Sequence, residues 1–127
     1  MTKNEISQFK RLLEAKRAEV AHGLRNRDEI AIEKSADEID EVQRAAECEV
    51  AMTKLDRESD LLRNIRAALR RIAEGAFGIC AHCETEISRK RLEALPWAPL
   101  CIRCQEAADR GEEKTAETLE RLLLSAA

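Results

Sequence analysis

Four of the five cysteines in this 127-residue chain stand in two Cys-x-x-Cys pairs, and their spacing limits the fold more than any other feature of the sequence. Cys80 and Cys83 form the first pair, Cys101 and Cys104 form the second, and 17 residues (84–100) separate them. This spacing is typical of a structural zinc site, in which four thiolates make a tetrahedral shell. Because four protein ligands leave no position for an activated water, the sequence predicts one structural Zn2+ and no zinc-based hydrolysis.

Disulfides, a redox dithiol and an iron site are the alternatives for these cysteines. Disulfides are disfavoured in a reducing cytoplasm, and a thioredoxin-like dithiol needs a βαβ context that the sequence does not show. Spacing alone does not separate iron from zinc in a tetrathiolate shell. His82 is a candidate ligand in place of one thiolate. Cys48 falls on an apolar helical stripe, where we expect a buried small residue, with a reactive thiol as the alternative.

The cysteine module, residues 75–110, is too short to bury much apolar surface, so we expect metal binding and folding to be coupled. Four thiolates around Zn2+ carry a net charge of about −2. Basic residues lie close to them in sequence and are candidates to offset this charge or to contact a partner. They are Arg89, Lys90, Arg91 and Arg103.

Two long apolar series precede the module. From residue 6 onward, apolar residues recur every three or four positions, which predicts a helix with one narrow apolar face. Its members are Ile6, Phe9, Leu13, Val20 and Leu24. A second series predicts another long helix that stops at Gly75. Its members are Ile39, Val42, Ala46, Cys48, Met52, Leu55, Leu62, Ile65, Leu69 and Ile72.

The chain is expected to reverse between the two series. Ser35 and Glu38 have the S-x-x-E spacing of a capping box, which marks the start of the second helix. If the chain folds back here, residues about equally far from the turn in sequence face each other across the hairpin. The pairs are Ile6 with Leu69, Leu13 with Leu62, and Val20 with Leu55. The sequence therefore predicts an all-α-dominated fold: an antiparallel coiled-coil hairpin over residues 1–74, with arms about 50 Å long, the four-cysteine module, and a C-terminal helix over residues 111–127.

Composition agrees with long helices and narrow seams, since 37% of the residues are charged and 2% are aromatic. No apolar run approaches the roughly 20 residues that a bilayer span needs, and the start MTKNEISQFK lacks the apolar core of a signal peptide. We therefore expect a cytoplasmic protein without membrane contact. A hairpin that closes within one chain needs no second copy, so we expect a monomer.

The turn, near residues 35–42, is acidic. Asp37 and Asp40 stand three residues apart, so a helix that begins at Ser35 presents both carboxylates on one face of its first turn. Their role is either to favour the helix through its dipole or to alter the charges inside a partner's cleft. Arginines gather at the opposite end of the rod, so it should enter a partner with a preferred direction.

The hairpin, the DEID tip and the run GAFGICAHCETEISRKRLEALPWAPLCIRC together resemble the DksA/TraR family of bacterial transcription regulators. The resemblance covers nearly the whole chain. It implies a protein that binds RNA polymerase, inserts its coiled coil through the secondary channel and alters the lifetime of promoter complexes, without specific promoter binding of its own. The two family tip aspartates, which would lie near the catalytic centre, match Asp37 and Asp40.

The chain departs from the family pattern at two places. Val42 stands where the tip motif D-x-x-D-x-A has alanine, and we expect this bulkier residue to change how the tip sits. In the best-known members, basic side chains hold guanosine tetraphosphate. The matching positions here are Asn64, Leu95 and Gln105, and none is cationic. Because a polyanionic nucleotide would lose its charge-assisted partners, we expect a weak or absent response to it through this site.

Two other functions compete with a polymerase-binding regulator. The first is a nucleic-acid-binding zinc module whose basic residues contact phosphates, although three aromatic residues are too few for a base-stacking platform. The second is a zinc-thiolate redox switch. An enzyme is the least supported class, because the sequence shows no nucleophile–base pair, phosphate loop or open metal site.

Overall fold

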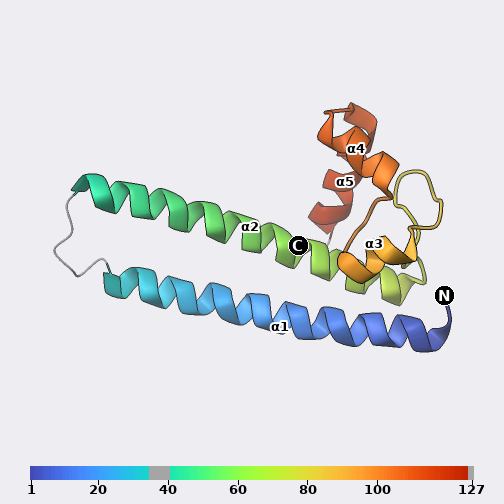
Figure 1. The fold of residues 1–127 in the computed structure, drawn as a ribbon, viewed down its shortest axis with the longest axis horizontal. Helices are drawn as coiled ribbons and strands as arrows, with labels where there is room; N and C mark the ends of the chain where they lie inside the picture. The colour runs from blue at the N-terminus through green and yellow to red at the C-terminus, as the bar shows by residue number, and fades with distance from the viewer. Residues whose placement is uncertain (35–40, 126–127) are drawn as a thin grey trace.

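The computed structural model describes residues 1–34 and 41–125, with side chains described for residues 1–25 and 42–124. Two long helices, α1 (Lys3–Lys34) and α2 (Glu41–Glu74), run antiparallel and form a slender rod. Three short helices follow, α3 (Arg89–Ala94), α4 (Ile102–Asp109) and α5 (Glu113–Ser125). Figure 1 shows residues 75–125, here called the head, beside the end of the rod that carries the N-terminus, here called the base. The predicted fold class is confirmed.

The described part of the chain contains no strand. Its one extended feature is an isolated antiparallel bridge between Ile79 and Glu86, in the loop that carries the first cysteine pair. α5 contacts both α4 and α2, so the C-terminal helix ties the head to the rod. None of the helices in the described residues is long and apolar enough to cross a membrane.

Glycines end two of the helices with the same hydrogen-bond pattern. Gly75 has φ +75°, and the N–H groups of Gly75 and Ala76 donate to Ile72 and Arg71 at 3.2 and 2.8 Å. Gly111 repeats this pattern after α4, with φ +84°. Both are Schellman motifs, which need a residue that tolerates positive φ. They turn the chain from the rod into the head and from α4 into α5.

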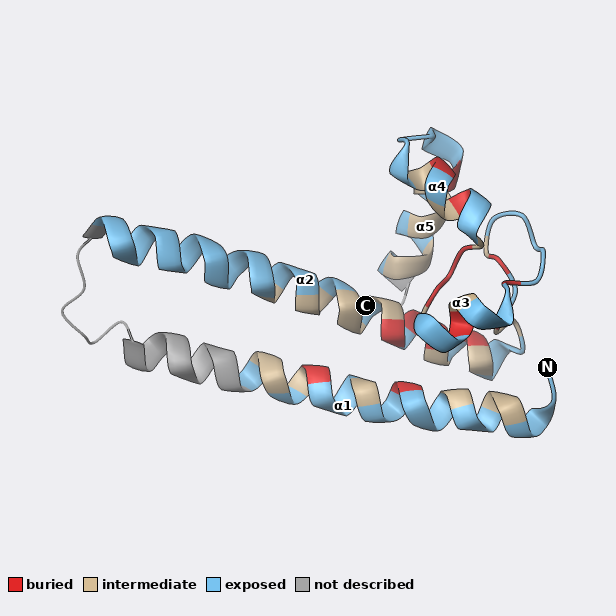
Figure 2. Ribbon diagram, in the orientation of Figure 1, coloured by how far each residue is buried: buried red, intermediate tan, exposed pale blue. Residues whose placement is uncertain are grey.

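The rod is packed in the half that lies next to the head. Four residues of its seam are buried: Leu13 and Val20 of α1, and Ile65 and Ala68 of α2. Partly buried leucines and Ile72 surround them, as do Phe77 and Trp97 of the head. Figure 2 shows buried residues near the base, whereas the distal part of α2 is exposed. The hairpin therefore has its apolar core where it meets the head.

The prediction that Cys48 is buried in the seam is wrong, because its side chain is exposed. Leu55, Leu62 and Leu69 are half-buried and follow a seven-residue spacing that reaches Cys48 when it is continued toward the turn. Cys48 is therefore on the seam face, but so short a side chain buries little surface against a helix whose axis lies about 8–10 Å away. Residues 42–54 of α2 are all exposed.

The apolar series also predicts Val42 and Met52 on the seam, and this prediction is wrong, because the two residues are 78% and 64% exposed. Neither fits the heptad positions of Leu55 and Leu62, since a residue belongs to the same seam row only at multiples of seven. The sequence series joined residues that point to different faces of α2. In the described part of α2, the buried seam is consequently shorter than predicted.

Candidate metal centre

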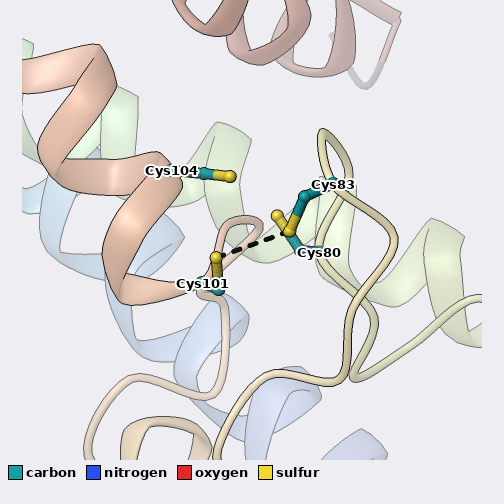
Figure 3. A group of neighbouring side chains, drawn as sticks. All are labelled: Cys80, Cys83, Cys101 and Cys104. Carbon is teal, nitrogen blue, oxygen red and sulfur yellow. Dashed lines mark hydrogen bonds between the residues drawn. The ribbon is translucent and has the colours of Figure 1, made fainter.

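The four predicted cysteine ligands meet at one place in the head, although one pair comes from a loop and the other from the start of α4. The Sγ atoms of Cys80, Cys83, Cys101 and Cys104 all lie within 4.8 Å of one another. Figure 3 shows the four side chains converging, with Cys83 and Cys101 joined by a contact of 3.6 Å between their sulfurs. Tetrahedral Zn2+ with Zn–S bonds of about 2.3 Å places its sulfurs about 3.8 Å apart. The thiols fit a zinc ion.

The first knuckle, residues 80–85, is shaped by its own backbone. Cys80 N–H donates to the Thr85 carbonyl at 2.8 Å, and Glu84 N–H donates to the Cys80 carbonyl at 3.1 Å. Glu84 completes the turn with φ +61°. These bonds fold the chain so that Cys80 and Cys83 face the same side.

The second knuckle is the start of a helix. Cys101 is the N-cap residue of α4, and Gln105 N–H donates to the Cys101 carbonyl at 2.9 Å. Cys104 follows three residues later in the first turn, and residues three apart on a helix share a face. The spacing Cys-x-x-Cys therefore aims both thiols at the first knuckle.

The environment shifts the pKa values of three thiols in different directions. The hydroxyl of Thr85, 2.9 Å from the sulfur, and the backbone of the same residue lower the pKa of Cys83 to about 6. Burial acts to raise the pKa of Cys80, but three backbone N–H groups of the knuckles outweigh it and lower that pKa. Burial raises the pKa of Cys104. Of these three thiols, Cys104 therefore holds its proton most firmly, and a metal ion that binds there has to displace that proton.

All five cysteines are free thiols, which disfavours the disulfide interpretation. Two of the cluster thiols, Cys80 and Cys104, also belong to the apolar core of the head, together with Ile87, Leu92 and Leu100. The metal centre and the apolar core of the head therefore share residues. A small module gains from such an arrangement because binding the metal also completes its packing.

His82 lies outside the group of four converging side chains. Its Nδ1 atom is 3.0 Å from the hydroxyl oxygen of Thr118 in α5. That hydroxyl donates its single proton to the Lys114 carbonyl at 2.9 Å, so it accepts from Nδ1–H of His82. His82 therefore links the first knuckle to the C-terminal helix.

Arg71 of α2 is a functional candidate that the sequence does not distinguish from the other arginines at this end of the rod. Its side chain is 8% exposed and donates to the carbonyls of Pro99, Ala76 and Ile79. No spacing rule marks it, since its partners are backbone atoms brought together by the fold. A run of arginines gives no hint which member is buried.

The basic residues predicted to lie near the metal have different surroundings. Arg89 pairs with Glu5 of α1 at 2.6 Å and with Glu93 at 3.4 Å, so it ties α1 to α3. Arg91 donates to the Leu100 carbonyl at 3.0 Å, next to the second cysteine pair. Lys90 and Arg103 are exposed.

The predicted effector residues Asp37 and Asp40 lie outside the described residues, as do Ser35 and Glu38. Val42, the departure from the family's tip motif, is in the first turn of α2 and is 78% exposed.

The three positions compared with a nucleotide site carry neutral side chains in described parts of the chain. Asn64 donates to the Asp60 carbonyl at 2.8 Å, and Gln105 donates to the Asp109 carboxylate at 3.1 Å. Leu95 is 38% exposed.

Comparison with known proteins first gives the class of the head. Residues 75–110 match the family model of the prokaryotic dksA/traR C4-type zinc finger. Together with the converging thiols, this match defines a zinc-finger protein with one structural zinc site.

Similarity to whole proteins then extends along the rod. The RNA polymerase-binding transcription factor DksA of Salmonella typhimurium is 35% identical over 119 residues, which cover 91% of this chain and 79% of the relative. The protein of the same name from Escherichia coli K12 is 34% identical with the same coverage. The structure of transcription factor DksA2 from Pseudomonas aeruginosa matches with a TM-score of 0.75 at 26% identity, over 87% of both chains. The chain belongs to the DksA/TraR family.

Proposed function

We propose that this chain binds RNA polymerase and regulates bacterial transcription by inserting its coiled coil into the secondary channel of the enzyme. The relatives named RNA polymerase-binding transcription factor DksA support the partner, since they match 91% of this chain. In this proposal Asp37 and Asp40 are the effector groups, and the protein acts on promoter complexes without chemistry of its own. We also propose that the protein is cytoplasmic, because RNA polymerase acts there, and monomeric, because a hairpin that closes within one chain needs no second copy.

The observation that carries the proposal is the shape of the rod. α2 has 34 residues and is therefore about 51 Å long, and two packed helices are only about 10 by 20 Å in cross-section. An object of this shape suits a narrow passage, and in this proposal the head stays outside it. The rod then acts as a spacer, and the head sets the depth of insertion.

Paired substitutions test the effector role. Asp37→Asn with Asp40→Asn should leave co-purification with RNA polymerase unchanged and abolish the effect on the lifetime of promoter complexes, because the amides keep the shape but remove two negative charges. Glu47→Gln with Glu49→Gln is the control, since both residues are exposed on α2 behind the tip. Unchanged transcription with the aspartate variant would show that the effector assignment is wrong.

We propose Cys80, Cys83, Cys101 and Cys104 as the zinc ligands, since their sulfurs all lie within 4.8 Å of one another, close to the separation of about 3.8 Å in a tetrahedral shell. The ion would supply folding free energy rather than reactivity, because four thiolates fill its shell. Metal analysis should find about one zinc per chain, and Cys104→Ser should lower this ratio. A folded protein that never contains metal would contradict the ligand set.

The structure gives less support to a nucleic-acid-binding module. Arg89 pairs with Glu5 and Arg91 donates to the Leu100 carbonyl, so both are held by internal partners. Lys90 and Arg103, the other two basic candidates, are exposed. We therefore expect no sequence-specific DNA binding. Salt-dependent binding of DNA in the absence of polymerase would favour this alternative instead.

A redox switch has a specific observation in its favour. Cys83 is exposed, and its sulfur is 3.6 Å from that of Cys101. Hydrogen peroxide could oxidise this pair to a disulfide while being reduced to water, and the loss of two ligands would release zinc. Zinc release after peroxide treatment, restored by a thiol reductant, would establish the switch beside the polymerase function.

We also propose a weak or absent response to guanosine tetraphosphate through the site that the resemblance implies. Asn64 and Leu95 carry no charge, and Gln105 already faces the Asp109 carboxylate, which repels a polyanion. Equal transcriptional effects with and without the nucleotide would agree with this proposal. A strong response that depends on Gln105 would contradict it.

A further inference from the structure

Arg71 is a buried cation at the junction of the rod and the head. Its side chain is 8% exposed, although it belongs to α2 and lies within a run of otherwise accessible arginines. One terminal nitrogen donates to the Pro99 carbonyl at 3.1 Å, and the other donates to the carbonyls of Ala76, at 3.1 Å, and Ile79. All three acceptors found among the described residues are carbonyls, which orient the guanidinium but do not neutralise it.

The acceptor carbonyls lie at the entrances to both knuckles. Ile79 directly precedes Cys80, and Pro99 stands two residues before Cys101. The Pro99 carbonyl also accepts the N–H of Ala81, inside the first knuckle, at 3.0 Å. One carbonyl therefore joins the first knuckle, the approach to the second knuckle and the rod. Moving the guanidinium would disturb both pairs of thiols at once.

The charges at this junction are complementary. A tetrathiolate zinc site carries about −2 in net charge, and Cys80, its most buried sulfur donor, is 1% exposed. Burial lowers the pKa of Arg71, and the negative charges of the Cys80 thiolate and then of the Glu74 carboxylate oppose that shift, so Arg71 interacts electrostatically with the thiolate as well as with its helix neighbour. Arg89 and Arg91 are more exposed than Arg71. Arg71 is consequently the cation best placed to act on the thiolates through a poorly solvated medium.

We propose that Arg71 is a positioning residue for the zinc site. Its buried charge offsets the charge of the thiolates, and its planar guanidinium holds both knuckles on the rod. Metal binding and the packing of the head against the rod are therefore coupled. Lysine cannot reproduce this role, because it presents a point charge rather than a fork that reaches several carbonyls. The proposal concerns the metal and the junction, and it stands whether or not the protein acts on polymerase.

The test uses the full chain with Arg71→Met and Arg71→Lys, and with Arg70→Met as the matched control. Arg70 is the preceding residue, about half exposed, and pairs with Glu74 on the surface. Zinc affinity is measured by competition with a chromogenic chelator, and zinc release is followed with time. The emission of Trp97, the single tryptophan, reports the seating of the head, since Trp97 and Arg71 line the same small cavity.

Arg71→Met should weaken zinc binding by about 10–100-fold, the range seen when groups that support metal ligands are removed, and should speed zinc release. Its helix end should survive, because the Schellman bonds use backbone atoms only. Arg71→Lys keeps the charge but not the fork, so it should lose less affinity and still shift the emission of Trp97. Arg70→Met should match the wild type.

Zinc affinity within twofold of the wild type in Arg71→Met, accompanied only by lower stability, would overturn the proposal and leave Arg71 as a packing residue. Equal effects of Arg71→Met and Arg70→Met would overturn it as well. If Arg71→Met does not fold even with excess zinc, Arg71→Lys decides. Faster zinc release together with shifted Trp97 emission would support the proposal, and wild-type values of both would refute it.

Discussion

The free energy of unfolding of the hairpin should depend on the half of the rod next to the head. Ile65 is 0% exposed in the seam of α2. Ile65→Ala removes about three methylene equivalents, worth about 0.8 kcal/mol each, so the transfer loss is about 2.4 kcal/mol. The cavity left behind adds to this, and the total should fall within about 2–5 kcal/mol.

Val50→Ala is the matched control in the distal half. Val50 belongs to the same helix and is also β-branched, but it is 56% exposed. Its truncation removes little buried surface, so the free energy of unfolding should change by less than about 0.5 kcal/mol. The contrast between the two variants therefore measures the packing gradient and not the helix propensity of alanine.

Urea unfolding followed by circular dichroism checks this contrast, with the free zinc concentration held constant because metal loss would break the two-state analysis. With a slope of about 1–3 kcal/mol/M, a loss of about 3 kcal/mol in Ile65→Ala moves the midpoint by about 1–3 M. Val50→Ala should leave it nearly unchanged. A loss in Val50→Ala as large as that in Ile65→Ala would show that the seam continues to the turn and that its assigned register is wrong.

Two further predictions concern the metal centre and α5. Zinc affinity should rise with pH through neutrality, because burial raises the pKa of Cys104 and its proton must leave when the metal binds. Toward acid, the zinc affinity should fall more steeply near pH 6, because Cys83 also takes up a proton there. Competition titrations across pH measure both. Thr118→Val should speed hydrogen exchange of the α5 amides, because it removes the acceptor for His82, whereas Thr118→Ser should not.

The metal centre was predictable because the residue types of its site and their short spacing can be read directly from the sequence. Each Cys-x-x-Cys pair needs only a tight turn or the first turn of a helix to aim two thiols together, as the knuckle at Cys80 and the N-cap at Cys101 do. The hairpin was predictable for a similar reason, since the two apolar series that contain Leu13 and Ile65 have helical spacing and lie on either side of a polar turn.

The register of the distal rod was not predictable in the same way. Ala46, Cys48 and Met52 are apolar enough to extend a periodic series, but all three are exposed, and Ala46 lies on another face of α2 than Cys48 and Met52. Small side chains satisfy a pattern without burying surface, so the pattern overstates the seam. Arg71 escaped prediction because its acceptors are carbonyls from residues 5 to 28 positions away. Only the folded chain gathers them.

The reach of the rod makes its base important for the proposed action of its tip. A lever about 50 Å long that tilts by about 10° at the base moves its far end by about 9 Å, whereas catalytic positioning is lost over about 1 Å. The base therefore has to fix the rod's direction to within about a degree or two. Two contacts can fix the direction of the rod relative to the head. One is the ring contact of Phe9 with Phe77, whose centroids are 5.4 Å apart, and the other is the set of hydrogen bonds from Arg71. Because two of the proposed zinc ligands, Cys80 and Cys104, are also core residues of the head, loss of the metal would loosen these supports and, under the proposed action, misdirect the tip without changing any residue in it.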